Sequence, residues 1–206
     1  MDFKKNKEQI IKKFEEIEHK DGLILIENII NNKYDEYLIK DIIKSLSKNK
    51  KKYTYEIYDY IIKNTNLNYD TILDKYDDNS LIHLCALNGN IDLLNYLIKK
   101  GVDINLKNKY GSTSLIFASV FSINTPSLEI IELLLDYRSD INFQNNDGNT
   151  ALMLSSRYLN SISSIETIKL LLENGASVNL KNKEGRTAYD IAPTKECRNL
   201  IKLYIN

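Results

Sequence analysis

An internal repeat is the feature that most restricts how this chain can fold. Three versions of one word, NKYGSTSLIFAS, NNDGNTALMLSS and NKEGRTAYDIAP, follow one another, and a rougher copy, KYDDNSLIHLCA, precedes them. Aligning the copies places one hydroxyl residue of each in a common register: Ser80, Thr113, Thr150 and Thr187. The spacings between these residues are 33, 37 and 37. A period of this length is typical of a protein built by stacking one small structural unit.

Each copy has the chemistry of a turn that leads into a helix. Its glycine can adopt the positive φ of a tight turn, and its hydroxyl can accept a hydrogen bond from the first helical turn. In the last copy, Thr187 and Asp190 have the spacing of a capping box. A second helix follows, with apolar residues at helical spacing, and it ends at Gly101 or Gly175, which suit a left-handed C-cap. One unit is therefore two helices and an extended arm, and it needs stacked neighbours to bury its apolar faces.

The residues after the second helix strengthen a resemblance to a known family. They read Gly-Val-Asp-Ile-Asn at 101–105, Ser-Asp-Ile-Asn at 139–142 and Gly-Ala-Ser-Val-Asn at 175–179. Together with the glycine–threonine word, this pattern resembles the ankyrin repeats over about Asp74 to Asn206. The resemblance implies an all-α repeat fold, an ankyrin-type solenoid of helix pairs with projecting hairpin fingers, closed by a C-terminal capping unit.

Departures from the family pattern lead to three expectations. Arg138 replaces the usual C-cap glycine, so we expect a strained positive φ there. The family histidine survives only as His83, whose ring we expect to bond the Ser80 hydroxyl rather than to take part in catalysis. Two units carry four extra residues, at about 121–126 and 158–163, and we expect these to lengthen the inner helix or its loop by about one turn.

The first 74 residues lack the glycine–threonine word but keep apolar helical patterns. Residues 56–68 echo a second helix and its arm, so we assign residues 34–74 to a degenerate ankyrin-like repeat and residues 1–33 to an N-terminal helical cap. Residues 75–206 then hold the ankyrin repeats and the C-terminal capping unit. A separate small helical domain at the N-terminus is the alternative. The lysine run at 48–52 lies beside acidic residues, so we interpret it as a solvated loop.

Composition narrows the possible partners and the location of the chain. Lys and Arg number 28, as do Asp and Glu, so the net charge is zero and gives no bulk attraction to nucleic acid or to an acidic membrane. No apolar run suits a signal peptide or a membrane span. Cys85 and Cys197 sit inside apolar patterns, so we expect buried thiols rather than a disulfide or a metal pair. We therefore expect an intracellular, cytoplasmic protein, in a host cell if its source is a virus or an intracellular microbe.

No combination of residues suggests an enzyme. The chain has two histidines, and Cys85 is two residues from His83, a spacing that points their side chains apart on a helix. Phosphate-binding glycine loops and metal-ligand clusters are not apparent. The sequence thus predicts no catalysis, no cofactor and no metal.

The resemblance instead implies a protein–protein interaction module, an adaptor or a sequestering protein, acting as a monomer without nucleic acid or membrane. It implies that a protein partner binds the concave face and the finger tips, at Tyr76, Asp77, Asn88, Lys109, Tyr110, Phe121, Asn146, Asp147, Arg157, Tyr158, Lys183, Glu184 and Arg186. For Phe121 and Tyr158 the alternative is that they pack the inserted turns. The alternative function is a substrate-recognition arm of a ubiquitin-ligase-type assembly, docked through the N-terminal helices.

Overall fold

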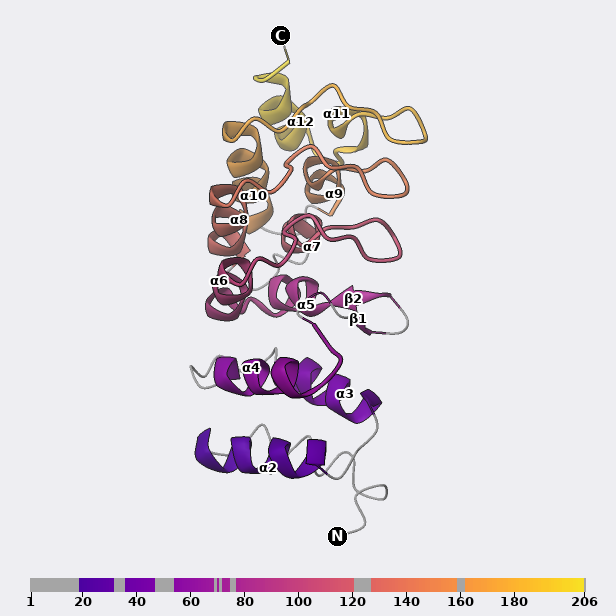
Figure 1. Ribbon diagram of the computed structural model, residues 1–206. Helices are drawn as coiled ribbons and strands as arrows, with labels where there is room; N and C mark the ends of the chain where they lie inside the picture. The colour runs from indigo at the N-terminus through magenta and orange to yellow at the C-terminus, as the bar shows by residue number, and fades with distance from the viewer. Residues whose placement is uncertain are drawn as a thin grey trace. The chain divides into compact units, whose positions relative to one another are not determined.

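The chain is made of short helices in two compact units, Met1–Val102 and Asp103–Asn206. The computed structural model describes residues 19–31, 36–46, 54–68, 70, 72–74, 77–120, 127–158 and 162–205 (Figure 1). The expectations for most of the N-terminal cap, for the lysine run, and for Tyr76 and Phe121 lie outside these residues. The all-α repeat fold is confirmed.

The first unit contains, in order, α2 (His19–Asn31), α3 (Glu36–Leu46), α4 (Thr54–Asn64), β1 (Ile72–Asp74), β2 (Asn79–Ser80), α5 (Leu81–Asn88) and α6 (Ile91–Lys99). Helix α2 packs against α4. Each helix buries isoleucines at helical spacing, and four of them are fully buried: Ile26 and Ile29 on α2, and Ile57 and Ile61 on α4. The buried Tyr58 hydroxyl donates to the Ile43 carbonyl at 3.2 Å and so joins α4 to α3. Two further contacts join α4 to the α6 end: the Tyr55 and Tyr96 rings stack, with centroids 4.8 Å apart, and Lys100 pairs with Asp59 at 3.0 Å.

The hairpin before α5 has the place of the first finger. Strands β1 and β2 pair antiparallel, and Asp78 in the turn between them has a φ of 54°. Asp78 occupies the position of the glycine in the later copies, and aspartate is one of the few residues that tolerate this conformation. At the start of α5, the Ser80 amide donates to His83 Nδ1 at 3.3 Å, and the Ser80 hydroxyl lies 3.0 Å from the same nitrogen. The expected contact of His83 is therefore confirmed.

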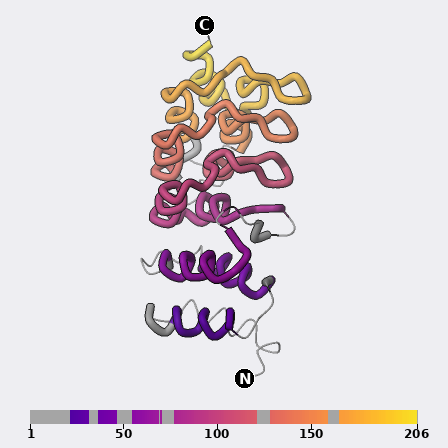
Figure 2. The backbone as a smooth tube through the Cα atoms, in the orientation of Figure 1, coloured from indigo at the N-terminus to yellow at the C-terminus, as the bar shows by residue number. Residues whose placement is uncertain are grey.

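The second unit repeats one arrangement three times. Its helices are α7 (Ser114–Val120), α8 (Ser127–Asp136), α9 (Ala151–Arg157), α10 (Ile162–Glu173), α11 (Ala188–Ile191) and α12 (Lys195–Lys202). The inner helices α7, α9 and α11 contact one another in succession, and the outer helices α8, α10 and α12 do the same behind them. Three loops project from the inner side, as Figure 2 shows for the magenta-to-yellow part of the chain.

Apolar residues at the expected positions form the core of this unit. Ile131, Leu134, Ile168, Leu171 and Leu172 are buried on the outer helices, and small buried residues on α7 and α9 let these inner helices approach closely: Ala118, Ser119, Ala151, Ser155 and Ser156. The hydroxyls of Ser119 and Ser156 donate to carbonyls one turn earlier, so their burial leaves no unmade hydrogen bond.

Helix capping follows the sequence in two of the three copies in this unit. Thr150 Oγ1 accepts from the Met153 amide at 3.2 Å, and Thr187 forms the expected capping box with Asp190. For Thr113 the expectation is wrong, because its buried Oγ1 has no hydrogen-bond partner in the part of the chain that the structure describes. The backbone bond from Phe117 N to Thr113 O at 3.1 Å is present, as are the equivalent bonds to the Thr150 and Thr187 carbonyls.

In the copy that begins at Thr150, the inserted residues do not lengthen the inner helix. Helices α5 and α9 end at Asn88 and Arg157, eight and seven residues after their aligned hydroxyls. In this copy the extra length goes partly into the outer helix, because α10 has 12 residues where α6 has 9. Helix α6 ends two residues before Gly101, and α10 ends two residues before Gly175. The added turn is thus at the start of α10. Residues 121–126 and 159–161 lie outside the described part of the chain.

Arg138 has the strained conformation that its position implies. Its φ is 62°, against 86° for Gly101 and 88° for Gly175 at the aligned positions. Its side chain is exposed. Arg138 therefore replaces glycine in the sequence, but the backbone keeps the left-handed conformation that the aligned glycines adopt.

Candidate interaction surface

Each of the three fingers in the second unit is folded by one asparagine. The side-chain oxygen of Asn145 accepts from the amides of Asp147 (3.0 Å) and Asn149 (2.9 Å), while its carbonyl accepts from Gly148 (2.8 Å). Asn108 and Asn182 make the equivalent bonds in the other two fingers. The sequence contains a signal for this turn that the sequence analysis missed: an asparagine lies three residues before the glycine in all three copies. An asparagine that closes its own turn is a well-known turn-former.

The fingers are also hydrogen-bonded to one another. The Asn146 amide donates to Tyr110 O at 2.9 Å, and the Lys183 amide donates to Asp147 O at the same distance. Side chains add to this, because Asn146 Nδ2 donates to Lys109 O at 2.8 Å and Gln144 Nε2 donates to Lys181 O at 2.9 Å. We call residues 107–112, 144–149 and 181–186 the finger row. Hydrogen bonds between neighbouring fingers hold their backbones at a fixed distance from one another.

Glycine is needed in the finger row for close approach as well as for its φ. A Cβ at Gly111 would lie 2.8 Å from Asn146 N, and a Cβ at Gly148 would lie 2.9 Å from Lys183 N. A Cβ at Gly185 would meet nothing within 4 Å, although its φ of 74° is similar to the 78° of Gly148. The first two glycines therefore admit the next finger, while the third is required only by its own turn.

The finger row brings together seven residues that the sequence assigned to partner binding: Lys109, Tyr110, Asn146, Asp147, Lys183, Glu184 and Arg186. Tyr110 is 52% exposed, and the Lys109 ammonium lies 4.8 Å from the centroid of its ring. Glu184 and Arg186 form an ion pair within the third finger. Asn146 also has a structural use, since its side-chain amide donates to the Lys109 carbonyl and so joins the first two fingers of the finger row.

Four more of these residues lie elsewhere. Arg157 and Tyr158 end α9, and the guanidinium carbon is 5.8 Å from the centroid of the tyrosine ring, which is 46% exposed. Asp77 and Asn88 belong to the first unit, where both are half-buried, in the finger turn and at the last position of α5. The structure therefore gathers seven of the assigned residues on the fingers of the second unit, while Arg157 and Tyr158 lie at the end of α9.

His83 and the two cysteines have structural surroundings. His83 is fully buried against Ser80, and burial raises the pKa of the Cys85 thiol well above its usual range. Burial likewise raises the pKa of the buried Cys197 thiol, and this effect outweighs that of a hydrogen bond with Ser156. Both thiols are free, as expected, and a raised pKa makes each a poor nucleophile. Within the described ranges no three metal-ligating side chains gather, and no helix is long and apolar enough to cross a membrane.

Comparison with known families agrees with this architecture. A sequence model described as "Ankyrin repeats (3 copies)" matches residues 36–145 and 121–205, which together span most of the chain. The chain belongs to the ankyrin-repeat family. Ankyrin repeats are generally protein–protein interaction modules, and the family is typically non-catalytic. No match was found among curated proteins. The ankyrin match begins inside the segment that we assign to a degenerate repeat, and the division at residues 33 and 74 stays a prediction.

Proposed function

We propose that this ankyrin-repeat protein is a non-catalytic adaptor or sequestering protein that binds a protein partner through its finger row and the end of α9. The observation that carries the proposal is the bonding between fingers, since Asn146 N and Lys183 N each donate at 2.9 Å to the finger before. A surface whose backbone is fixed before binding loses less conformational entropy when a partner docks. We further propose that the protein acts inside the cell as a monomer and does not bind nucleic acid.

Three exposed side chains are the best candidates for most of the binding energy. Tyrosine and arginine dominate interface hot spots, and Tyr110, Arg157 and Tyr158 are the exposed examples among the assigned residues of the second unit. The lysine beside Tyr110 and the arginine beside Tyr158 both lie over the aromatic ring. These contacts restrict the rings in the free protein, which favours their use as rigid anchors.

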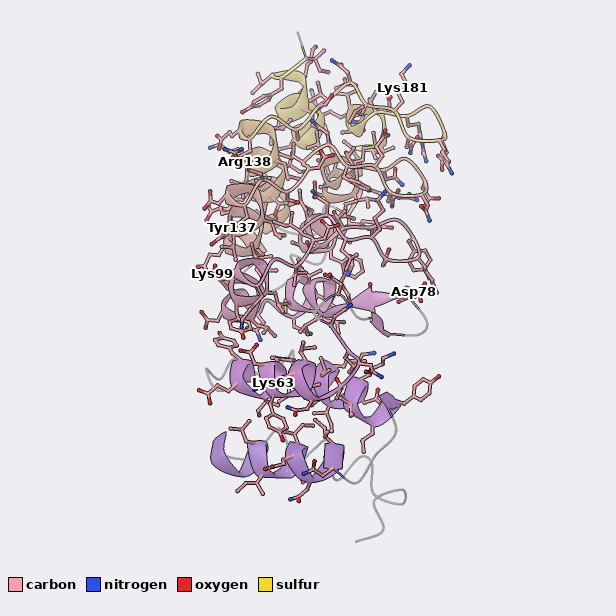
Figure 3. All side chains as sticks on the ribbon, viewed as in Figure 1. Lys63, Asp78, Lys99, Tyr137, Arg138 and Lys181 are labelled. Carbon is pink, nitrogen blue, oxygen red and sulfur yellow. The ribbon has the colours of Figure 1, made fainter. Side chains whose placement is uncertain are left out.

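Affinity capture on the full chain, followed by mass spectrometry, would name the partner and allow a titration. We expect Tyr110→Ala with Tyr158→Ala to weaken that partner's binding tenfold or more, about 1.4 kcal/mol. Tyr137→Ala is the control, because Tyr137 is 40% exposed, close to the 46% of Tyr158, and directly follows the outer helix α8 (Figure 3). Equal losses in the double variant and in the control would refute a site on the fingers.

The ubiquitin-ligase reading predicts a different result. Among the described side chains of the N-terminal helices, Ile24 on α2 (47%) and Tyr37 on α3 (64%) are exposed. If Tyr37→Ala abolishes capture while the finger variant is neutral, docking through the N-terminal helices replaces the finger-row proposal. We expect the reverse.

A further inference from the structure

Charge is unevenly distributed along the second unit. Residues 103–206 contain 11 Lys and Arg against 11 Asp and Glu, so the unit as a whole is neutral. The finger row alone holds five cations, Lys107, Lys109, Lys181, Lys183 and Arg186, against the two carboxylates of Asp147 and Glu184. Helices α8 and α10 hold one cation, Lys169, against the five carboxylates of Glu129, Glu132, Asp136, Glu166 and Glu173. The balance of the whole sequence therefore conceals a local excess of each sign.

The two groups of charges lie on opposite sides of the unit. The fingers project from the inner side, α8 and α10 form the outer side, and α7 and α9 lie between them (Figure 1). Figure 3 places Lys181 on the finger side and Tyr137 and Arg138 on the other. A neutral unit with this arrangement attracts acidic groups to its fingers and repels them from α8 and α10.

The lysines of the finger row keep their charge accessible to a partner. The ammonium groups of Lys107 and Lys109 lie over the Phe143 and Tyr110 rings, 4.5 and 4.8 Å from the centroids, and all four lysines are exposed. Within the described residues, no carboxylate forms an ion pair with Lys183, whereas Arg186 is paired with Glu184. The finger of the first unit is different in character, since it carries Asp77 and Asp78.

We propose that the finger row docks an acidic protein segment, a stretch rich in Asp and Glu that lies across the three fingers with an apolar residue against Tyr110. This proposal rests on the function proposed above and specifies the chemistry of the partner. A protein segment can place its carboxylates opposite the lysines and keep them away from Asp147 and Glu184. A nucleic acid backbone has a phosphate at every step and would meet both carboxylates, so it fits this row less well.

The test uses the full chain and a fluorescent peptide of about 12 residues, rich in Asp and Glu and containing one Leu, with anisotropy as the readout. We expect binding that weakens as salt rises, because the Debye length falls from about 10 Å at 0.1 M to about 3 Å at 1 M salt. Lys109→Glu with Lys183→Glu should weaken binding about tenfold or more. Lys195→Glu with Lys202→Glu is the matched control, with the same change in net charge on exposed residues of α12, and should change binding less than about twofold.

Three results would overturn the proposal: no binding of the acidic peptide, equal losses in both charge-reversed proteins, or tighter binding of a single-stranded oligonucleotide of the same charge. The natural partner separates this failure from failure of the proposed function. If capture of that partner depends on Tyr110 but ignores salt and the Lys109 and Lys183 reversals, the acidic-segment proposal is wrong and the finger-row function stands. If neither Tyr110 nor the two lysines matter for capture, both are wrong.

Discussion

Replacing Gly148 and Gly185 separately with alanine would measure what contact between fingers contributes to stability. Both glycines have a positive φ, 78° and 74°, so a Cβ strains the local backbone about equally, by about 1 to 2 kcal/mol. Only Gly148 also faces a neighbouring finger, with Lys183 N 2.9 Å and Asn182 Cα 3.0 Å from the new Cβ. Non-bonded carbon atoms prefer about 3.5 to 4.0 Å, so the third finger has to move away by several tenths of an ångström.

That movement sets the expected difference between the two variants. Overpacking of this kind costs about 1 to 3 kcal/mol, and it also stretches the bond from Lys183 N to Asp147 O, now 2.9 Å. We therefore expect Gly148→Ala to lose about 1 to 3 kcal/mol more than Gly185→Ala. With a urea slope of about 2 kcal/mol/M, the midpoint should be about 0.5 to 1.5 M lower.

Urea unfolding followed by circular dichroism is the assay, with a second probe to check for stepwise unfolding, because repeat arrays do not always unfold in one step. Equal midpoints for the two variants would mean that the fingers separate without cost. The argument for a fixed finger row would then lose its energetic basis.

Three further predictions come from individual side chains. Arg138→Gly should raise stability by about 1 kcal/mol, measured by calorimetry, because the φ of 62° is then unstrained, and Asp78→Gly should gain less, since aspartate tolerates its φ of 54° better. Hydrogen bonds from the Thr187 amide and hydroxyl lower the pKa of the Asp190 carboxyl, so the ionised carboxylate stabilises the fold fully above its ordinary pKa of 3.8. This stabilisation should be lost as pH falls through the lowered pKa of the folded state, and Asp190→Asn should remove this part of the acid dependence of the urea midpoint. Cys85 should react with a thiol reagent only at the rate of unfolding, because it is fully buried; prompt reaction in the native protein would contradict this.

The sequence predicted the parts of the fold that depend on local chemistry repeated at one period. Arg138 aligns with two glycines, so its positive φ could be expected, and His83 follows a capping serine at the spacing that brings their polar atoms together. The failure at Thr113 has a different origin. Its residue type suits a cap as well as that of Thr150, yet its hydroxyl has no hydrogen-bond partner among the residues that the structure describes. Whether a hydroxyl turns toward a backbone amide is decided by packing that the sequence does not display.

Contacts between neighbouring fingers were harder to predict from the sequence than the structure of each repeat copy. The bonds from Asn146 and Lys183 to the preceding fingers join residues far apart in sequence, and nothing in the local composition of either finger marks them. The asparagines at the base of each finger could have been predicted, because their spacing to glycine is the same in every copy. The prediction that extra residues lengthen the inner helix is wrong for α9, which ends at Arg157, because part of the added length goes into α10 instead.

The bonding between fingers has a direction, and that direction bears on how such a chain can change in evolution. The second and third fingers of the finger row each donate a backbone amide to the finger before, and the first and second fingers each offer a backbone carbonyl to the finger after. A duplicated unit inserted between two existing ones would therefore find an acceptor on one side and a donor on the other, whatever residues occupy its tip. The tip can then diverge freely as long as the asparagine and glycine remain. Gene duplication could in this way alter the length of the row and its charge pattern independently.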